Sequence, residues 1–427
     1  MSPSSEVVAS RGTYKASAID MLRSNARIIC ALGPADFGGL DRVRARLLQL
    51  ASAGPAARLG LHATSTSQHW DYRPEDICAD VTAIDPLCQS DLASVMIDLA
   101  TNPTDAPFRA RLGGNYLIID LSHGLSDAVL PVAIVAALAD PSADTELPEW
   151  ATVRSIRDPL PGALGGWLVR NPRKVAEILL GKFHRAAPAE TSAATTETMA
   201  WTRSPALAVA TSANGATTAL RRWRDRHAPG ISISALQCGA IARALNERGV
   251  ATTDTTGFLF DCRRYLKAGT PVLGNFAVGV DFVGVDPTSP EAVHRAVNNA
   301  VEMGRPLAAG TLSTLKYLRT RSALPSSAAT TMSPNPAAQL TFSDIGRIPQ
   351  LEDIAWRSDN PSQCGFFTIS EPTRPDSIVV TSMQIRGTFQ VSVSFHDNVF
   401  DAETISSALE LALTDPFTLL NPQEMSR

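Results

Sequence analysis

The sequence predicts an α/β protein (an α+β sandwich) of two halves, and three observations indicate this fold class. The chain has 427 residues, which is longer than one hydrophobic core usually supports. Segments with helical periodicity alternate with apolar, β-branched segments on both sides of the middle of the chain. Between them lies a stretch rich in Ala, Ser and Thr, which is typical of a connection. We therefore expect an N-terminal half (1–186), a crossover linker (187–217) and a C-terminal half (218–427).

The N-terminal half shows two amphipathic helices and a junction between a buried strand and a buried helix. Apolar residues recur at helical spacing over 38–54, and a second helix is predicted over 90–103. An apolar run over 116–121 predicts a buried strand, and the alanine-rich segment that follows Asp127 predicts a buried helix. A strand is also predicted between residue 14 and the first helix, and two short strands over 56–65 and 68–73. The glycine-rich segment 162–167 follows no strand, so it predicts a loop and no nucleotide site.

The C-terminal half is predicted to alternate helices with strands and to end in a strand pair and a helix. Helical periodicity with capping residues is present over 232–249, 289–304 and 401–415. β-branched and aromatic residues predict strands over 206–211, within the crossover, and over 257–266, 274–285 and 339–349. The segments 377–387 and 388–397 are expected to be antiparallel strands, because only the turn at Gly387-Thr388 separates them.

Composition excludes several classes of function. Lys and Arg (38) nearly balance Asp and Glu (42), and neither sign clusters, so the chain has no electrostatic footprint for nucleic acid. The six cysteines form no C-x-x-C pair and no zinc-like spacing. No segment has the layout of a signal peptide or the ~20 apolar residues of a membrane span. We therefore expect a cytoplasmic protein that binds no nucleic acid, has no membrane span and holds no metal or bound cofactor.

His123 is the residue that most readily offers chemistry. It follows the predicted buried strand, whereas the other six histidines fall at predicted surface or turn positions, namely His62, His69, His184, His227, His294 and His396. A neutral imidazole at a strand end can take a proton from an alcohol or an amine. Gly124 allows the chain to turn, and Asp127 falls where a helix N-terminus favours a carboxylate. A buried structural histidine followed by an N-capping aspartate explains the same pattern equally well.

The spacing of His123 and Asp127 resembles the H-H-x-x-x-D-G motif of condensation-domain-like acyltransferases. That superfamily includes chloramphenicol acetyltransferase, plant BAHD acyltransferases and the condensation domains of peptide synthetases. Three later segments resemble, in order, those of its polyketide-associated (phthiocerol dimycocerosyl transferase-like) branch: "FDCRRYL" at 260–266, "GNFAVGVDF" at 274–282 and "LTFSDIGRIP" at 340–349. The resemblance spans about residues 15–420. It implies two chloramphenicol acetyltransferase-like halves with mixed sheets and an active-site tunnel between them.

The resemblance also implies roles for particular residues. His123 matches the histidine assigned as general base, and Asp127 matches the aspartate that pairs with an arginine of the second half. Arg263 is the candidate partner and Arg264 the alternative, because alternation along a strand lets only one of them face Asp127. Backbone N–H groups at Gly124 and Ala128 would support the oxyanion. The candidates for the wall of the tunnel are Ser122, Asn275, Asp344 and Arg347.

Three residues depart from the family pattern. Ser122 replaces the first histidine of the motif, Ala128 replaces its final glycine, and Asp344 stands where the branch usually has asparagine. Ala128 still supplies a backbone N–H group, whereas the carboxylate of Asp344 cannot donate the hydrogen bond of an amide.

The function that the resemblance implies is thioester-dependent O-acyl transfer in lipid or natural-product (secondary metabolite) biosynthesis. The donor would be acyl-CoA, or an acyl group on the phosphopantetheine arm of an acyl or peptidyl carrier protein. The acceptor would be a small-molecule alcohol, and we expect a monomer. Two alternatives stay open: amide formation with an amine acceptor, and a catalytically decayed module that recruits a partner. The changes at Ser122 and Ala128 motivate the decayed module, and the retained His123, Asp127 and Arg263 oppose it.

Overall fold

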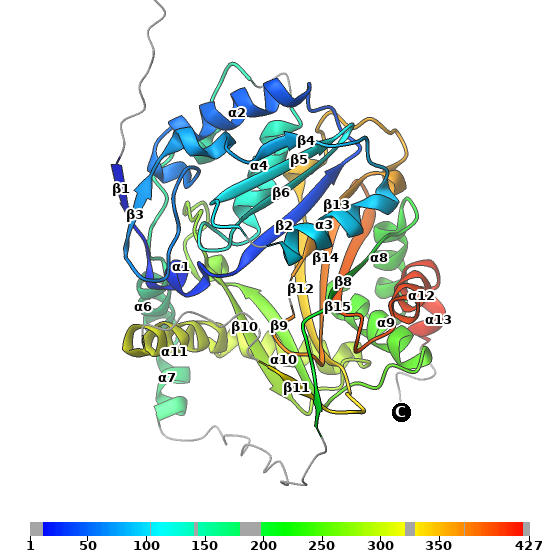
Figure 1. The fold of residues 1–427 in the computed structure, drawn as a ribbon. Coiled ribbons are helices and arrows are strands. Elements are labelled where there is room, and N and C mark those ends of the chain that lie inside the picture. Colours follow the sequence, from blue (N-terminus) through cyan, green and yellow to red (C-terminus); the bar gives the residue numbers. More distant parts are fainter. Residues whose placement is uncertain are drawn as a thin grey trace, which may run out of the picture.

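Two mixed β-sheets with helices packed on them form the molecule (Figure 1). The structure is a computed structural model that describes residues 12–102, 104–140, 144–179, 198–320, 329–370 and 372–421. Residues 180–197, which include the first part of the predicted crossover (187–197), therefore lie outside the described residues. In the described part of the chain, no helix is both long enough and apolar enough to cross a membrane.

The first sheet has five strands, and its centre carries the strand that precedes His123. In spatial order they are β13 (Gly365–Ile369), β2 (Arg27–Gly33), β6 (Tyr116–Ser122), β5 (Phe108–Gly113) and β4 (Val81–Ala83). The pair β4–β5 is parallel and the other neighbouring pairs are antiparallel. Asp120 interrupts the apolar side chains of β6, and it is fully buried between Arg27 and Arg109, which both donate to its carboxylate.

The second sheet has six strands from the C-terminal part of the chain. Their spatial order is β10 (Ala277–Val283), β9 (Thr255–Asp261), β12 (Gln339–Arg347), β14 (Ser377–Ile385), β15 (Thr388–His396) and β8 (Pro205–Thr211). β12 runs parallel to both of its neighbours, and β14 and β15 form the predicted antiparallel pair. The predicted fold class, α/β with two mixed sheets, is therefore confirmed.

Helices supply the apolar layers on these sheets. On the first sheet, α2 (Leu40–Ser52) and α4 (Val129–Leu138) bury Leu47 and Ile134 in one cluster with the strands. On the second, α9 (Ile233–Glu247) and α12 (Ala402–Thr414) bury Leu236 and Leu409. The other helices are α1 (Ala18–Arg23), α5 (Glu149–Thr152), α6 (Leu160–Arg170), α7 (Pro172–Leu179), α8 (Ala216–His227), α10 (Pro290–Glu302), α11 (Arg305–Thr320) and α13 (Pro416–Leu419).

Helix α3 (Leu92–Thr101) joins the two sheets. Its apolar face packs on Ile29 and Ile118 of the first sheet and on Leu207 of the second. Figure 1 shows α3 in front of β2 and β13, close to the strands of the second sheet. Because β13 follows β12 in the sequence but pairs with β2, the chain itself also crosses from one sheet to the other. These two links fix the position of one sheet against the other.

Several local predictions were wrong. The segment 56–65 is not a strand: a 3₁₀ turn (Pro55–Ala57) is followed by Arg58 in a left-handed conformation, φ 66°. The glycines of 162–167 lie in α6, because Leu160, Ala163 and Trp167 bury one helical face, and this packing outweighs the low helix propensity of glycine. His396 is fully buried and packs edge-on against Trp201, so it is not a surface residue.

Candidate active site

The loop 122–128 between β6 and α4 carries His123, and two backbone hydrogen bonds hold the first part of this loop. The His123 N–H donates to the carbonyl of Ala26 at 2.8 Å, and the Leu125 N–H donates to the carbonyl of Ser122 at 2.9 Å. The first bond ties the loop to the start of β2, and the second closes a tight turn around His123. The strand end that the sequence predicts therefore presents this side chain on a fixed backbone.

The hydrogen bond of the imidazole determines which ring nitrogen can act as a base. His123 Nδ1 lies 2.9 Å from the carbonyl oxygen of Ser126. A carbonyl oxygen can only accept, so Nδ1 carries the proton in the neutral ring. The lone pair is then on Nε2, which is the nitrogen able to remove a proton from an acceptor.

The surroundings of His123 keep its ring neutral. The side chain is partly buried, and this loss of solvation, together with the positive charge of Arg23, lowers the pKa of His123 to about 4. The negative charge of Asp127 acts in the opposite direction but does not outweigh them. At neutral pH the ring is therefore in the basic form that proton abstraction requires.

Asp127 faces an arginine of the second half and does not contact the imidazole through a hydrogen bond. Arg263 donates from Nη1 to Asp127 Oδ2 at 2.9 Å and from Nη2 to Oδ1 at 3.0 Å. The Phe276 N–H also donates to Oδ2, at 2.9 Å. Arg264, the alternative partner, is exposed. The pairing predicted for Asp127 is therefore made by Arg263, and it spans the two halves.

Arg263 uses its whole guanidinium group. Beyond Asp127, Nε donates to the carbonyl of Val272 at 3.0 Å and Nη2 to that of Gly274 at 2.8 Å. Nη1 also donates to Asp261 Oδ1 at 3.1 Å. Arg263 lies in a 3₁₀ turn (Cys262–Tyr265), because β9 ends at Asp261, five residues before the end of the segment predicted as a strand (257–266). The turn directs this side chain back towards Asp127.

A buried network that the sequence analysis did not assign holds the carbonyl groups of the loop. Asn275 Nδ2 donates to the carbonyl of His123 at 2.7 Å and to that of Gly124 at 3.3 Å. Arg58 donates to the carbonyls of Gly124 and Leu125 and forms an ion pair with Asp20 at 2.9 Å. Asp20 Oδ1 accepts from both the N–H and the side-chain amide of Asn275, each at 3.1 Å. The Ser126 carbonyl accepts from His123, so all four backbone carbonyls from 123 to 126 accept a hydrogen bond.

The sequence contains only weak indications of this network. Arg58 lies in a segment that was predicted to be a strand, and Asp20 in the short helix α1, which was not predicted. Asn275 was named as a candidate for the tunnel wall, but it is 3% exposed and its amide contacts the loop backbone. Residues 20, 58 and 275 lie far apart in the sequence, and no local pattern indicates that they meet in the fold.

Ser122, Gly124 and Ala128 have distinct local environments. The Ser122 hydroxyl donates to the carbonyl of Ser24 at 3.1 Å and accepts from the Gly124 N–H at 3.2 Å. A Cβ on Gly124 would lie 2.9 Å from Ser24 Cα, so close approach to this backbone explains the glycine. Ala128 is the N-cap of α4, where backbone N–H groups lack intrahelical acceptors.

Asp344 and Arg347, on β12, are exposed and have contacts of their own. Asp344 accepts from the hydroxyls of Ser234 and of Ser382, the latter at 3.0 Å. Arg347 donates to Glu352 at 2.9 Å. None of these hydrogen bonds links either residue to the loop that carries His123.

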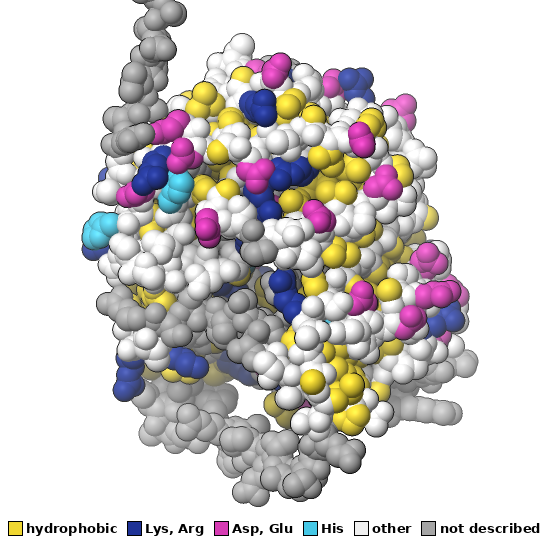
Figure 2. All heavy atoms as spheres, viewed as in Figure 1, with side chains coloured by type: hydrophobic (Ala, Val, Ile, Leu, Met, Phe, Trp, Pro, Cys, Tyr) yellow, Lys and Arg dark blue, Asp and Glu magenta, His cyan; other side chains and the backbone are white. Residues whose placement is uncertain are grey.

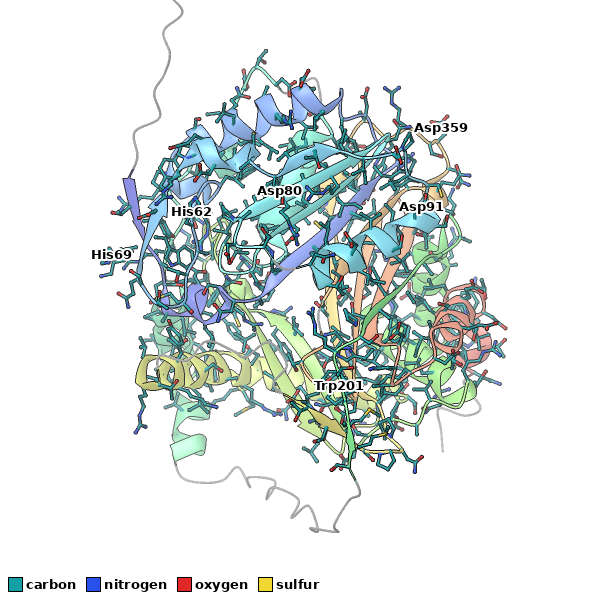
Figure 3. The ribbon with its side chains drawn as sticks, in the orientation of Figure 1. His62, His69, Asp80, Asp91, Trp201 and Asp359 are labelled. Atoms are coloured by element: carbon teal, nitrogen blue, oxygen red, sulfur yellow. The ribbon has the colours of Figure 1, made fainter. Side chains whose placement is uncertain are left out.

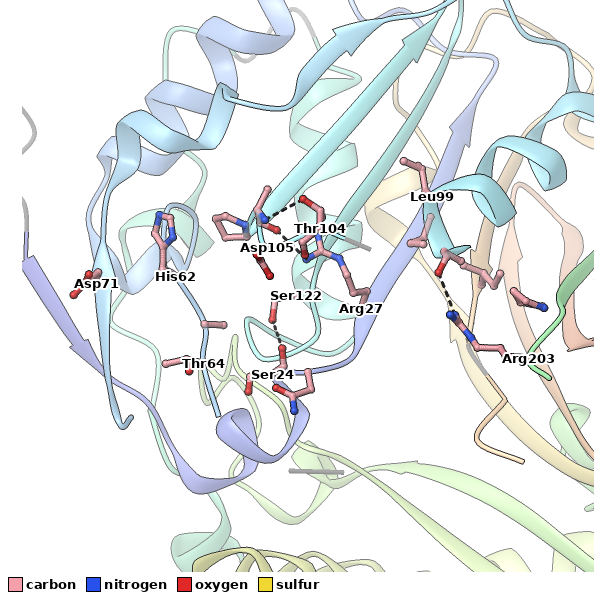
Figure 4. A pocket seen from close by; sticks show the side chains of 18 of the residues that line it. Ser24, Arg27, His62, Thr64, Asp71, Leu99, Thr104, Asp105, Ser122 and Arg203 are labelled. Carbon is pink, nitrogen blue, oxygen red and sulfur yellow. Dashed lines mark hydrogen bonds between the residues drawn. The ribbon is translucent and has the colours of Figure 1, made fainter. Parts of the chain in front are cut away.

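A cavity of about 800 Å³ reaches this loop at Ser122. Its wall combines residues of the first half with Arg203 and Pro205 from the predicted crossover and Ile369 from the C-terminal half. Figure 4 shows Ser24, Arg27 and Ser122 on one side of it, His62 and Thr64 on another, and Arg203 beside Leu99. His123 is not among the described residues that line it, so Ser122 is the contact between cavity and loop.

The cavity opens on a face that carries basic side chains. Figure 2 shows Lys and Arg side chains gathered near the middle of this face, where the surface is hollowed. Figure 3 places His62 and His69 on the β3 side (His69–Tyr72) of the same view. His62 Nε2 lies 2.9 Å from Asp76 Oδ2, and no group of His, Cys, Asp and Glu within the described ranges could hold a metal ion.

No protein-family model matches this chain, and no curated protein matches it in sequence. Solved structures do match its fold. The TRI3 trichothecene 15-O-acetyltransferase of Fusarium sporotrichioides is 11% identical with a TM-score of 0.59, over 94% of this chain and 95% of that one. The condensation domain of the monacolin K polyketide synthase MokA is 13% identical with a TM-score of 0.58, over 96% and 98%.

An epimerization domain of tyrocidine synthetase B is 16% identical with a TM-score of 0.53, over 100% of this chain and 99% of that one. At these identities the likeness concerns the fold. The chain therefore has the two-lobed, chloramphenicol acetyltransferase-like fold of acyltransferases and condensation domains, as the motif resemblance implied.

Proposed function

We propose that this protein transfers an acyl group from a thioester to the hydroxyl of a small-molecule acceptor, with His123 as general base. The observation that carries the proposal is the hydrogen bond from His123 Nδ1 to the Ser126 carbonyl, which leaves the lone pair on Nε2. The thioester would be acyl-CoA or an acyl group on the phosphopantetheine arm of a carrier protein. The fold shared with a trichothecene O-acetyltransferase and a polyketide-synthase condensation domain supports this chemistry.

The reaction needs one proton carrier and no covalent acyl-enzyme. Nε2 of His123 takes the proton of the acceptor hydroxyl while its oxygen attacks the thioester carbonyl carbon. The tetrahedral intermediate then collapses as the C–S bond breaks, and the imidazolium returns the proton to the leaving thiolate. The products are an ester and a free thiol. A positioned base of this kind typically contributes ~10²–10⁴-fold to the rate.

Stabilisation of the oxyanion falls to the start of α4. The N–H of Ala128 lies at this N-terminus, where backbone donors and the helix dipole favour negative charge. The Gly124 N–H already donates to Ser122, so Ala128 is the stronger of the two predicted donors. Loss of one such donor costs roughly 3–4 kcal/mol of transition-state stabilisation in comparable sites.

Asp127 and Arg263 act as positioning residues in this scheme. Their ion pair fixes the end of the loop, while Arg58 and Asn275 fix its carbonyl groups. A loop held in this way keeps Nε2 in place without reorganisation at the moment of reaction. Natural-product and lipid biosynthesis supply both thioester donors and hydroxylated acceptors, and we place the protein in such a pathway.

The experiment that tests the proposal identifies the product. Purified protein is mixed with acetyl-CoA or with an acyl carrier protein, and with a panel of alcohols and amines, and the products are identified by mass spectrometry. We expect esters with the wild-type protein, and a ~10²–10⁴-fold lower rate of ester formation with His123→Ala. His227→Ala, an exposed histidine at the end of α8, is the matched control and should leave ester formation unchanged. Amides in place of esters would favour the condensation alternative, and carrier binding without any transfer would favour the recruitment module.

A further inference from the structure

A second cavity lies in the helical layer of the second half, formed by different residues from those of the candidate active site. It measures about 220 Å³ and is bounded by α8, α9, α12 and α13, with Phe389 of β15 at its base. Figure 1 shows these four helices together on the right of the molecule. Leu220, Leu236, Ile241 and Leu413 make its wall apolar, and Phe417, which is 38% exposed, stands where it meets solvent.

Gln237 places an unpaired amide in this apolar wall. It lines the cavity and is only 6% exposed. Neither Nε2 nor Oε1 has a hydrogen-bond partner among the described residues. A buried amide with neither its donor nor its acceptor paired is costly and rare in folded proteins. The group is therefore available to a molecule that occupies the cavity.

We propose that this cavity binds a small, neutral molecule in which a carboxamide or lactam group is attached to an apolar body of about one ring. Such a group offers an N–H to Gln237 Oε1 and a carbonyl oxygen to Nε2, so it pairs both atoms at once. A carboxylate could pair only Nε2, and none of the described lining residues is charged to balance it. The volume exceeds the ~150 Å³ of an engineered cavity that admits benzene.

The site is independent of the proposed acyl transfer, because none of its lining residues belongs to the network around His123. Benzamide is a suitable probe, with toluene as an apolar control and benzoate as a charged control. Binding of each to the full-length protein is measured by titration calorimetry or by ligand-observed NMR. We expect benzamide to bind at least about tenfold more tightly than toluene or benzoate, since two hydrogen bonds are gained.

Gln237→Leu tests the amide directly. This change keeps the wall filled and removes both polar atoms, so the preference for benzamide over toluene should disappear while toluene still binds. Ala240→Phe, which occupies the cavity from α9, should abolish binding of both. Equal affinity of the wild-type protein for benzamide and toluene, or an undiminished preference in Gln237→Leu, would overturn the proposal. The comparison of probes on the wild-type protein stands even if one variant fails to fold.

Discussion

Asp127 and Arg263 are 136 residues apart in the sequence, and they meet in a bidentate ion pair that connects the two halves beside the loop of His123. Both side chains are mostly buried, with exposed fractions of 9% and 18%. The pair connects the loop to the 3₁₀ turn that follows β9, and it leaves the imidazole free of the carboxylate. Asp127 therefore has a different place from the aspartate of a hydrolase triad, which orients its histidine directly.

Breaking this pair should destabilise the protein. Arg263→Gln leaves the Asp127 carboxylate buried without its cation, and we expect a loss of about 3 kcal/mol in the free energy of unfolding, measured by urea denaturation. The exposed neighbour provides the control, since Arg264→Gln should change stability by less than about 0.5 kcal/mol. The double variant Asp127→Asn/Arg263→Gln should lose less than the sum of the single losses. Strict additivity would contradict a direct interaction.

Asn275 should affect the rate more than substrate binding. Asn275→Ala removes the donors to the carbonyls of His123 and Gly124, so the loop loses its fixed position. We expect stability to fall by about 1–3 kcal/mol and kcat to fall while KM stays close to the wild-type value. Steady-state kinetics on folded protein measure this split. Asn299→Ala, an exposed position on α10, is the control, and an equal effect of both changes would argue against a positioning role.

The pH dependence of catalysis should report the lowered pKa of His123. The protonated ring cannot act as a base, so kcat/KM should rise with pH through about 4 and be level near neutrality. For an exposed histidine, this acid limb of the pH profile would lie near pH 6.5. Removing the positive charge in Arg23→Gln should raise the pKa and move the limb to higher pH. Burial remains the larger cause, so the limb should stay below 6.5. A limb that does not move would show that Arg23 has no influence on the base.

Alanine substitution of Gly124 tests the close packing of the loop, and the same substitution at Gly162, which has open space around it, is the control. Gly124→Ala places a Cβ 2.9 Å from the backbone of Ser24, and we expect a loss of about 1–3 kcal/mol in the free energy of unfolding. Gly162→Ala, in α6, meets no atom within 4 Å and should stabilise the protein by about 0.5–1 kcal/mol. Thermal or urea unfolding gives both values. Stabilisation by Gly124→Ala would mean that the loop does not approach Ser24.

Strong periodicity and capping allowed much of the fold to be predicted. The helix around Leu236 follows its cap Ser232, the first residue of the predicted range 232–249, and α10 begins at Pro290, within the predicted range 289–304. The strand β5 (Phe108–Gly113) was missed because Arg109 and Arg111 interrupt its apolar residues, although Arg109 is buried against Asp120. The pairing of β13 with β2 depends on contacts more than 300 residues apart, as between Thr368 and Cys30, and no local pattern encodes it.

The candidate site, like the fold, could be predicted from the sequence only in part. His123 and Asp127 stand out at a change of periodicity, and the family resemblance suggested Arg263. Arg58 and Asp20 could not be found in this way, because a buried ion pair between residues in different elements has no recognisable sequence pattern. Only the folded chain shows that these charges hold the carbonyl groups of the loop.

The rate of acyl transfer by His123→Ala tests the central claim most directly. Release of free thiol from acyl-CoA is followed in the presence of an alcohol that the wild-type protein acylates, at pH 7 and saturating donor. We predict that kcat falls by ~10²–10⁴-fold, because the acceptor loses its base, while circular dichroism shows an unchanged fold. A rate within a few-fold of the wild-type value would contradict the assignment of His123 as the general base.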